Sequence, residues 1–335
     1  MSDSRFKISF FSLLLASLST LQAASPTTWK PETFASGQAD AVVYINTLQA
    51  KNSMDPRLWE LIQKDKNHAL DAGKKSSVFQ MKDRDLEIMF HFFLDSANPF
   101  HFHIQGEAHL SGDIAQDVKT LQSIAKTSNA IRVTEEKKAN GSRYHVLLKP
   151  RNEGPPLALT FSHSNGKILF QIRTRNSGNL PDSPLPEPGG RSPFSPVGRY
   201  PDFSYVITAK PQKFASVPLF STPRNKAFAE FLSATESLRM TGKIQGVFLL
   251  ATGEAEFKSA ARASSYYQQI APLIKRYSPT GPKQDVISAK ASLQGRSIRM
   301  EASVNLAVVW NFLSGTVLSA PEAQISDEPE NGDDE

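Results

Sequence analysis

Two apolar segments joined by a polar turn constrain the fold of this chain most. Residues 86–112 read LEIMFHFFLDSANPFHFHIQGEAHLSG, with aromatic and aliphatic side chains on both sides of a turn that contains Pro99. Short apolar runs bounded by turn residues are typical of paired β-strands. The segment therefore predicts a β-hairpin. Gly106-Glu107-Ala108 are expected to lead from its second strand into a helix over 113–126, where apolar residues recur at helical spacing.

Similar landmarks recur in the second half of the chain. A strand start, a helix start with a proline and a Gly-Glu-Ala step follow one another twice in the same order. The first copies are Asp40 to Ile45, Asp55-Pro56-Arg57 and Gly106-Glu107-Ala108, and the second copies are Asp202 to Ile207, Thr222-Pro223-Arg224 and Gly253-Glu254-Ala255. Three matches in order predict an internal repeat, in which one unit is used twice.

Each half reads as strand, helix, two strands, helix and further hairpin strands. Asn140-Gly141 and Asn165-Gly166, which lie between short runs, are strong hairpin signals. This order predicts an α+β fold of two related domains, each an antiparallel sheet with helices packed on one face. In element order and in the three landmarks, the chain resembles uncharacterised bacterial envelope proteins built from tandem α+β repeats. No activity is attached to that resemblance.

The composition predicts where the domains end. Seven prolines in 176–202, with glycines and serines among them, exclude a regular helix or strand there. We therefore predict a signal peptide at 1–24, a first α+β domain at 25–175, a proline-rich linker at 176–202, a second α+β domain at 203–320 and an acidic disordered tail at 321–335.

The first 24 residues have the three parts of a secretory signal. Arg5 and Lys7 precede an apolar core of moderate length, and Ala23-Ala24 offer small residues for cleavage. An uncleaved membrane anchor is the alternative, but the apolar core is short for a membrane span. The chain has no cysteine. Export without disulfides favours the periplasm or cell envelope of a bacterium, with no transmembrane span in the mature chain.

The charge is unevenly distributed along the chain. The net charge is +5, to which residues 1–24 contribute +1 and the tail from Glu322 contributes −7, so the predicted folded part carries +11. Such a body attracts anionic partners. We expect an envelope protein, an anionic envelope polymer or a lipid surface as the partner. Nucleic acid is discounted because the chain is expected to be exported.

Histidines in the opening hairpin are the candidate metal ligands. His101 and His103 are two residues apart and therefore point to one face of a strand, and His91 precedes them on the partner strand. Such a cluster is suited to Zn or Cu. Convergence depends on register: pairs whose numbers sum to 194 place His91 opposite His103, and a sum of 195 turns His91 to the other face. The alternative is that His101 and His103 only mark a polar side.

No complete catalytic motif occurs in the chain, and no cofactor is expected. The sequence therefore predicts an exported noncatalytic binding or structural protein of the bacterial envelope. The alternative is a metal-binding or metal-dependent hydrolytic protein that uses His91, His101 and His103. Because no catalytic residue is assigned, the sequence does not decide whether the protein is an enzyme, and it favours a protein without enzymatic activity.

Overall fold

A computed structural model describes ten stretches of the chain. They are residues 39–62, 85–95, 101–127, 129–139, 141–149, 156–174, 195–196, 199–216, 226–277 and 287–309. The predicted signal peptide, most of the proline-rich linker, the acidic tail and the predicted helix start at Thr222-Pro223-Arg224 lie outside the described residues. Within the described part, no helix is long and apolar enough to cross a membrane.

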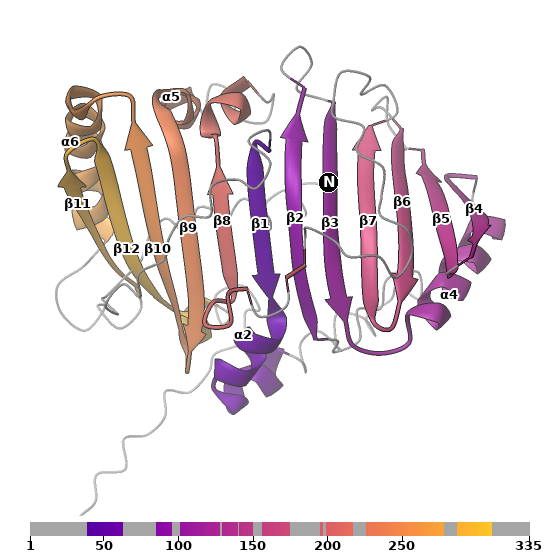
Figure 1. Cartoon of the computed structure of the whole chain (residues 1–335). Helices are drawn as coiled ribbons and strands as arrows, with labels where there is room; N and C mark the ends of the chain where they lie inside the picture. The colour runs from indigo at the N-terminus through magenta and orange to yellow at the C-terminus, as the bar shows by residue number, and fades with distance from the viewer. Residues whose placement is uncertain are drawn as a thin grey trace, which may run out of the picture.

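Twelve antiparallel strands form one sheet (Figure 1). Their order is β11-β12-β10-β9-β8-β1-β2-β3-β7-β6-β5-β4. The strands are β1 (Ala41–Asn46), β2 (Leu86–Leu94), β3 (Phe102–Leu110), β4 (Ile131–Lys138), β5 (Gly141–Leu148), β6 (Leu157–Ser164), β7 (Lys167–Thr174), β8 (Tyr205–Ala209), β9 (Thr235–Gln245), β10 (Phe248–Phe257), β11 (Ile287–Gln294) and β12 (Ser297–Asn305). The helices are α2 (Thr47–Ser53), α4 (Ile114–Thr127), α5 (Lys226–Ala234), α6 (Ala260–Tyr277) and the 3₁₀ helix η1 (Pro211–Ser216). The α+β class with an antiparallel sheet is confirmed.

The pairing of β1 with β8 makes the sheet continuous across the predicted domain boundary. Tyr44 lies opposite Met89 of β2 on one side and opposite Val206 of β8 on the other. Outward from this pair, β2 and β3 follow on one side, and β9 and β10 follow on the other. Strands of both predicted domains therefore belong to one sheet. This pairing also satisfies backbone groups of β1 and β8 that would be unpaired if each strand were the edge of a separate sheet.

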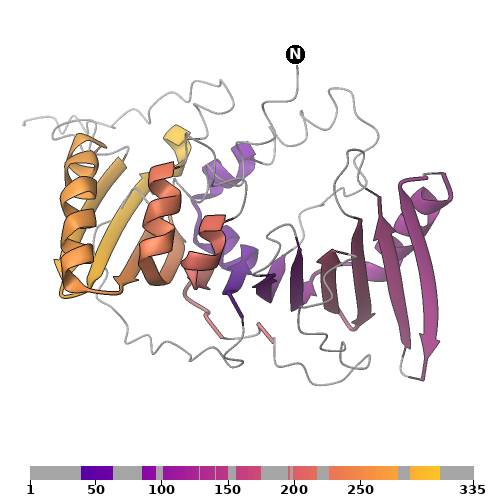
Figure 2. The same ribbon diagram turned by 90° about the horizontal axis from the view of Figure 1, so that it is seen from above.

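The two faces of the sheet differ in what covers them. On one face, which we call the helix face, apolar side chains of β3 and β7 pack against α4, and those of β9, β10 and β12 pack against α5 and α6. The strand registers place both clusters on the same side of the sheet. Figure 2 shows α5 and α6 near one end of the sheet and α4 at the other end. We call the opposite side the open face.

The middle of the open face is covered by the turn that leads into β8. Tyr200 packs edge-on against Tyr44, with ring centroids 5.1 Å apart, and Phe203 joins the same cluster. Tyr44 and Met89 beneath them are almost fully buried. A polar tie lies beside this cluster: the buried Asp40 carboxylate accepts from Leu94 N–H at 2.8 Å and pairs with Lys213 Nζ at 2.8 Å.

Most predicted elements are present, with two differences. The helix predicted from Asp55-Pro56 is confirmed, because Asp55 Oδ1 accepts from the Arg57 and Leu58 N–H groups at its start. The hairpin turn at Asn165-Gly166 is confirmed by positive φ angles of 49° and 77°. The prediction that Gly106-Glu107-Ala108 leave the strand is wrong, since β3 continues to Leu110.

Helix α2 was not predicted from the sequence. It follows β1 directly, and the Asn46 side chain caps it by accepting from Gln49 N–H at 2.9 Å. None of its residues is fully buried, so the apolar periodicity that indicates a helix is missing.

Candidate functional site

His91 and His103 lie on the open face, but not opposite each other. The β2–β3 pairs sum to 196, which places His91 opposite Gln105 and Phe93 opposite His103. Neither of the two registers considered from the sequence occurs. Both imidazoles still share one face, because the actual sum is also even. The Phe93 ring neighbours both, with its centroid 6.5 Å from that of His91 and 5.5 Å from that of His103.

His103 uses a ring nitrogen for a buried hydrogen bond. Its Nε2 lies 2.9 Å from Gln171 Nε2 of β7, and its residue is 2% exposed. Because the amide nitrogen donates, His103 Nε2 accepts and carries no proton. The lone pair that a metal ion at this nitrogen requires is therefore already engaged.

His101 lies outside the strand, at the entrance to β3. Its Nδ1 is 3.8 Å from Asp95 Oδ2, at the end of β2. Within the described ranges, no group of three His, Asp or Glu side chains is placed to hold a metal ion. Metal binding by His91, His101 and His103 stays a prediction of the sequence.

His91 is a buried histidine that is neutral at neutral pH. Burial, and secondarily the positive charge of Arg199, lowers the pKa of His91 from 6.5 to about 4. Arg199 belongs to the turn that covers the middle of the open face. Folding therefore keeps the proton off this imidazole throughout the range above about pH 5.

A fully buried carboxylate lies farther along the same face. Glu107 of β3 is 0% exposed, and its Oε1 lies 2.7 Å from His109 Nε2. Its Oε2 forms an ion pair with Lys167 Nζ of β7 at 3.1 Å. The side chains of His109 and Lys167 are 33% and 25% exposed, so the buried carboxylate holds two cation-forming groups toward solvent. Glu107 and His109 share this face because β3 stays regular past Gly106.

Replacing Glu107 by glutamine tests the role of this charge. We expect Glu107→Gln to lower the free energy of unfolding by about 2 kcal/mol, because the amide cannot pair with the Lys167 ammonium. The loss stays below that of a fully buried ion pair, since the partly exposed side chains of His109 and Lys167 can turn toward water. Urea unfolding at neutral pH measures it.

Glu254→Gln is the matched control for this change. Glu254 follows Gly253 as Glu107 follows Gly106, and it lies half-buried on the open face of β10. We expect an effect below about 1 kcal/mol there. Equal losses in the two variants would show that burial of the Glu107 charge is not what makes it important.

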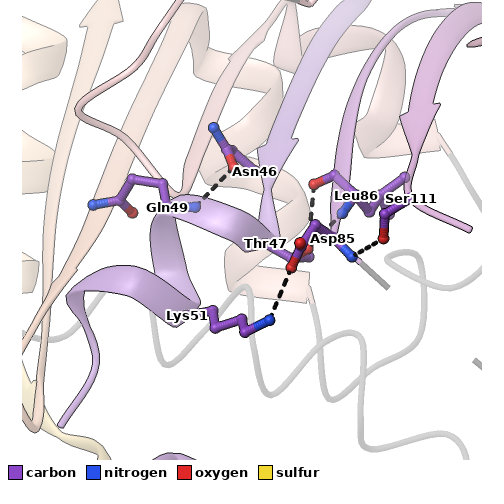
Figure 3. A network of polar contacts seen from close by, with 7 residues as sticks. All are labelled: Asn46, Thr47, Gln49, Lys51, Asp85, Leu86 and Ser111. Carbon is purple, nitrogen blue, oxygen red and sulfur yellow. Dashed lines mark hydrogen bonds and ion pairs between the residues drawn. The ribbon is translucent and has the colours of Figure 1, made fainter. Parts of the chain in front are cut away.

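A second polar network fixes the adjoining ends of β2 and β3 to α2 (Figure 3). Thr47 Oγ1 accepts from Leu86 N–H at 2.8 Å, and Lys51 Nζ pairs with Asp85 Oδ1 at 3.3 Å. The backbone N–H of Asp85 donates to Ser111 Oγ at 2.8 Å. These contacts hold the start of β2 and the end of β3 in place, and they therefore position Glu107 and His109 nearby on β3.

An exposed histidine on the open face of β5 contacts a hydroxyl and a carboxylate. His145 of β5 lies between Thr160 Oγ1 and Glu136 Oε2, at 3.2 and 3.4 Å. Lys138 Nζ is 2.6 Å from Glu136 Oε1, and the Lys138 ammonium, followed by His145, holds the pKa of Glu136 below its usual range. A hydroxyl, an imidazole and a carboxylate in a row is an order that some hydrolases use. The His145 side chain is 45% exposed, so water competes for both contacts, and the row is suited to surface binding rather than to activating a nucleophile.

Comparisons with known proteins give distant structural neighbours. No protein-family model matches the chain, and no curated protein matches it. Crystal form III of the Treponema protein TP0453 is 14% identical, with a TM-score of 0.41, and covers 87% of this chain and 100% of that chain. Crystal form IV is 13% identical, with a TM-score of 0.39, and covers 82% of this chain and 93% of that chain. Similarity at this level does not indicate a shared function.

Proposed function

We propose that this chain is an exported, noncatalytic binding or structural protein of the bacterial envelope. The observation that carries the proposal is the open face, whose exposed parts lie on the side of the sheet opposite α4, α5 and α6. Its exposed parts on β4 to β7 and on β9 to β12 present charged and hydroxyl side chains. A rigid sheet with one face packed and the other polar is suited to holding a ligand without chemistry.

The location in the envelope rests on the sequence. The positive segment, the apolar core and the small residues at Ala23-Ala24 support export, and the absence of cysteine supports a bacterial rather than a eukaryotic route.

We also propose that the two halves are related domains, 25–175 and 203–320, that arose from one duplicated unit. The three sequence landmarks support this, as does the matching arrangement of strands on the two sides of the β1–β8 pair. The hairpin of β4 and β5 would then be an addition to the first half, since β7 borders β3 as β12 borders β10.

Export is tested by fractionation of a bacterial host that expresses the chain. We expect a C-terminally tagged chain to be recovered in the periplasmic or membrane fraction, with its N-terminus cleaved near Ala24. Recovery of the intact chain in the cytoplasm would contradict export.

A pull-down from envelope extract, eluted in rising salt and analysed for protein, lipid and glycan, then tests binding. Screening weakens exposed charge contacts first, so the elution profile separates charged from apolar contacts. A partner that elutes reproducibly supports a binding role. Elution of nothing above the level seen with an unrelated basic protein contradicts it.

A further inference from the structure

The strand order gathers basic residues that are scattered in the sequence. On β4 to β7, the open face carries five cationic side chains and one carboxylate, Glu136. The cations are Arg132 and Lys138 of β4, Arg143 of β5, and Lys167 and Arg173 of β7. We call these five residues and the side chains between them the basic face. Arg132 and Arg173 are 41 positions apart in the chain, yet they lie in one row across the sheet, with Leu147 and Ala158 between them.

The open face of the other half has no such excess of charge. On β9 to β12, it carries Arg239, Lys243, Lys290 and Arg299 against Glu254, Glu256 and Glu301. Arg299 Nε pairs with Glu301 Oε1 at 3.2 Å, and Glu256 pairs with Arg296 at 2.6 Å. Ion pairs also form on the basic face, where Lys138 pairs with Glu136 and Lys167 pairs with Glu107 of β3, but the excess of cations over carboxylates is larger there. The basic charge of the described open face is concentrated on one half of the sheet.

The side chains between the cations indicate what kind of anion fits. The central row of the basic face runs Thr134, His145, Thr160 and Gln171 across the four strands. All four can donate or accept hydrogen bonds, and the exposed ones offer no bulky apolar group for insertion into a lipid layer. Gln171 is buried and bonds to His103, so the outer groups are Thr134, His145 and Thr160. Neighbouring strands lie about 4.8 Å apart, so these three residues offer a hydrogen-bonding group at each step across β4, β5 and β6.

We propose that the basic face binds a linear anionic polysaccharide that lies across strands β4 to β7. The cations attract its acidic groups, and the row of Thr134, His145 and Thr160 hydrogen-bonds its hydroxyl groups. The inference rests on the proposed function, to which it adds the surface and the class of partner. Polysaccharide is favoured over a membrane surface because the row is polar and regularly spaced.

Binding of the purified chain to polygalacturonate, which carries one carboxylate on each sugar, tests the proposal. We expect binding at low salt that weakens as salt rises, with neutral dextran not bound. The variant Arg132→Gln/Arg173→Gln removes two exposed cations of the basic face. It is expected to bind about tenfold more weakly. The slope of the logarithm of the binding constant against the logarithm of the salt concentration is expected to be smaller in magnitude by about one to two.

A matched control removes the same charge from the other half. Lys243→Gln/Lys290→Gln lies on the same open face, on β9 and β11, and changes the net charge equally. We expect its affinity to stay within about twofold of the unmodified chain. Circular dichroism and urea unfolding of both variants show whether each keeps the fold.

Four outcomes would overturn the proposal. They are no binding of polygalacturonate at low salt, equal losses in the two double variants, tighter binding to phosphatidylglycerol vesicles than to polygalacturonate, and binding that appears only after the acidic residues 322–335 are deleted. The last result would make the chain's own tail the occupant of the basic face. None of these outcomes bears on export, which the fractionation tests separately.

Discussion

Gly106→Ala is expected to lower the free energy of unfolding by about 3 kcal/mol or more, or to prevent folding. A Cβ at this position would lie 2.6 Å from Phe90 Cβ and 2.9 Å from Phe170 Cζ, and closer still to the backbone oxygen of Met89. Side chains from β2 and β7 therefore occupy the space above β3, and a backbone atom cannot rotate away. Relief requires β2 and β3 to separate, which disturbs the α4 cluster on the helix face. Urea unfolding measures the loss.

Gly253→Ala is the control, because Gly253 is the residue that the internal repeat matches to Gly106. A Cβ there would meet only Met300 Cε at 3.8 Å and Arg239 O at 3.9 Å, which are ordinary contacts. We expect this variant to be neutral or stabilised by a few tenths of a kcal/mol, because alanine costs less conformational entropy than glycine. Equal destabilisation in both variants would show that the loss comes from glycine replacement in general and not from close packing at Gly106.

This pair of glycines marks how far the sequence could predict the fold. The recurring Gly-Glu-Ala step lies on β3 in one half and on β10 in the other, and the strands, hairpins and helices around both were predicted from periodicity and turn residues. The sequence pattern could not predict which residues of other strands contact Gly106. Phe170 comes from β7, and only the strand order brings that strand beside β3. Local sequence predicts elements, whereas the contacts of an element depend on pairing between distant segments.

At the candidate site, too, the sequence predicted features of a single strand but not how the strands pair. Alternation along β3 puts His103, Glu107 and His109 on one face, although the strand was expected to end near Gly106. The register with β2 was outside both options considered, because the turn between the strands does not fix which residues pair. The basic face needed the strand registers, since Arg132, Arg143 and Arg173 share one face only through the pairs that join β4, β5, β6 and β7.

Acidification from pH 7.5 to pH 4.5 is expected to cost about 2 to 3 kcal/mol of stability through His91 alone. The pKa of His91 is about 4 in the folded chain, against 6.5 for an ordinary histidine. Between these two values the unfolded chain binds a proton that the folded chain does not, so stability falls as the pH falls through this window. Above about pH 7, both states are neutral at this position and the contribution vanishes. His91→Gln cannot titrate and should lose less stability than the unmodified chain over the same change of pH.

The quantity to measure is the difference between the two pH profiles, from urea unfolding at pH 7.5, 6.0 and 4.5. Carboxylates titrate in the same range, but they contribute equally to both chains and cancel. His145→Gln is the control, because its side chain is 45% exposed and stays in contact with water after folding. The His145→Gln profile shows how much of any difference comes from removing an exposed imidazole. Parallel profiles for His91→Gln and the unmodified chain would mean that protonated His91 is tolerated in the folded state. The turn that carries Arg199 would then have to move away from the sheet at low pH, because it covers this part of the open face.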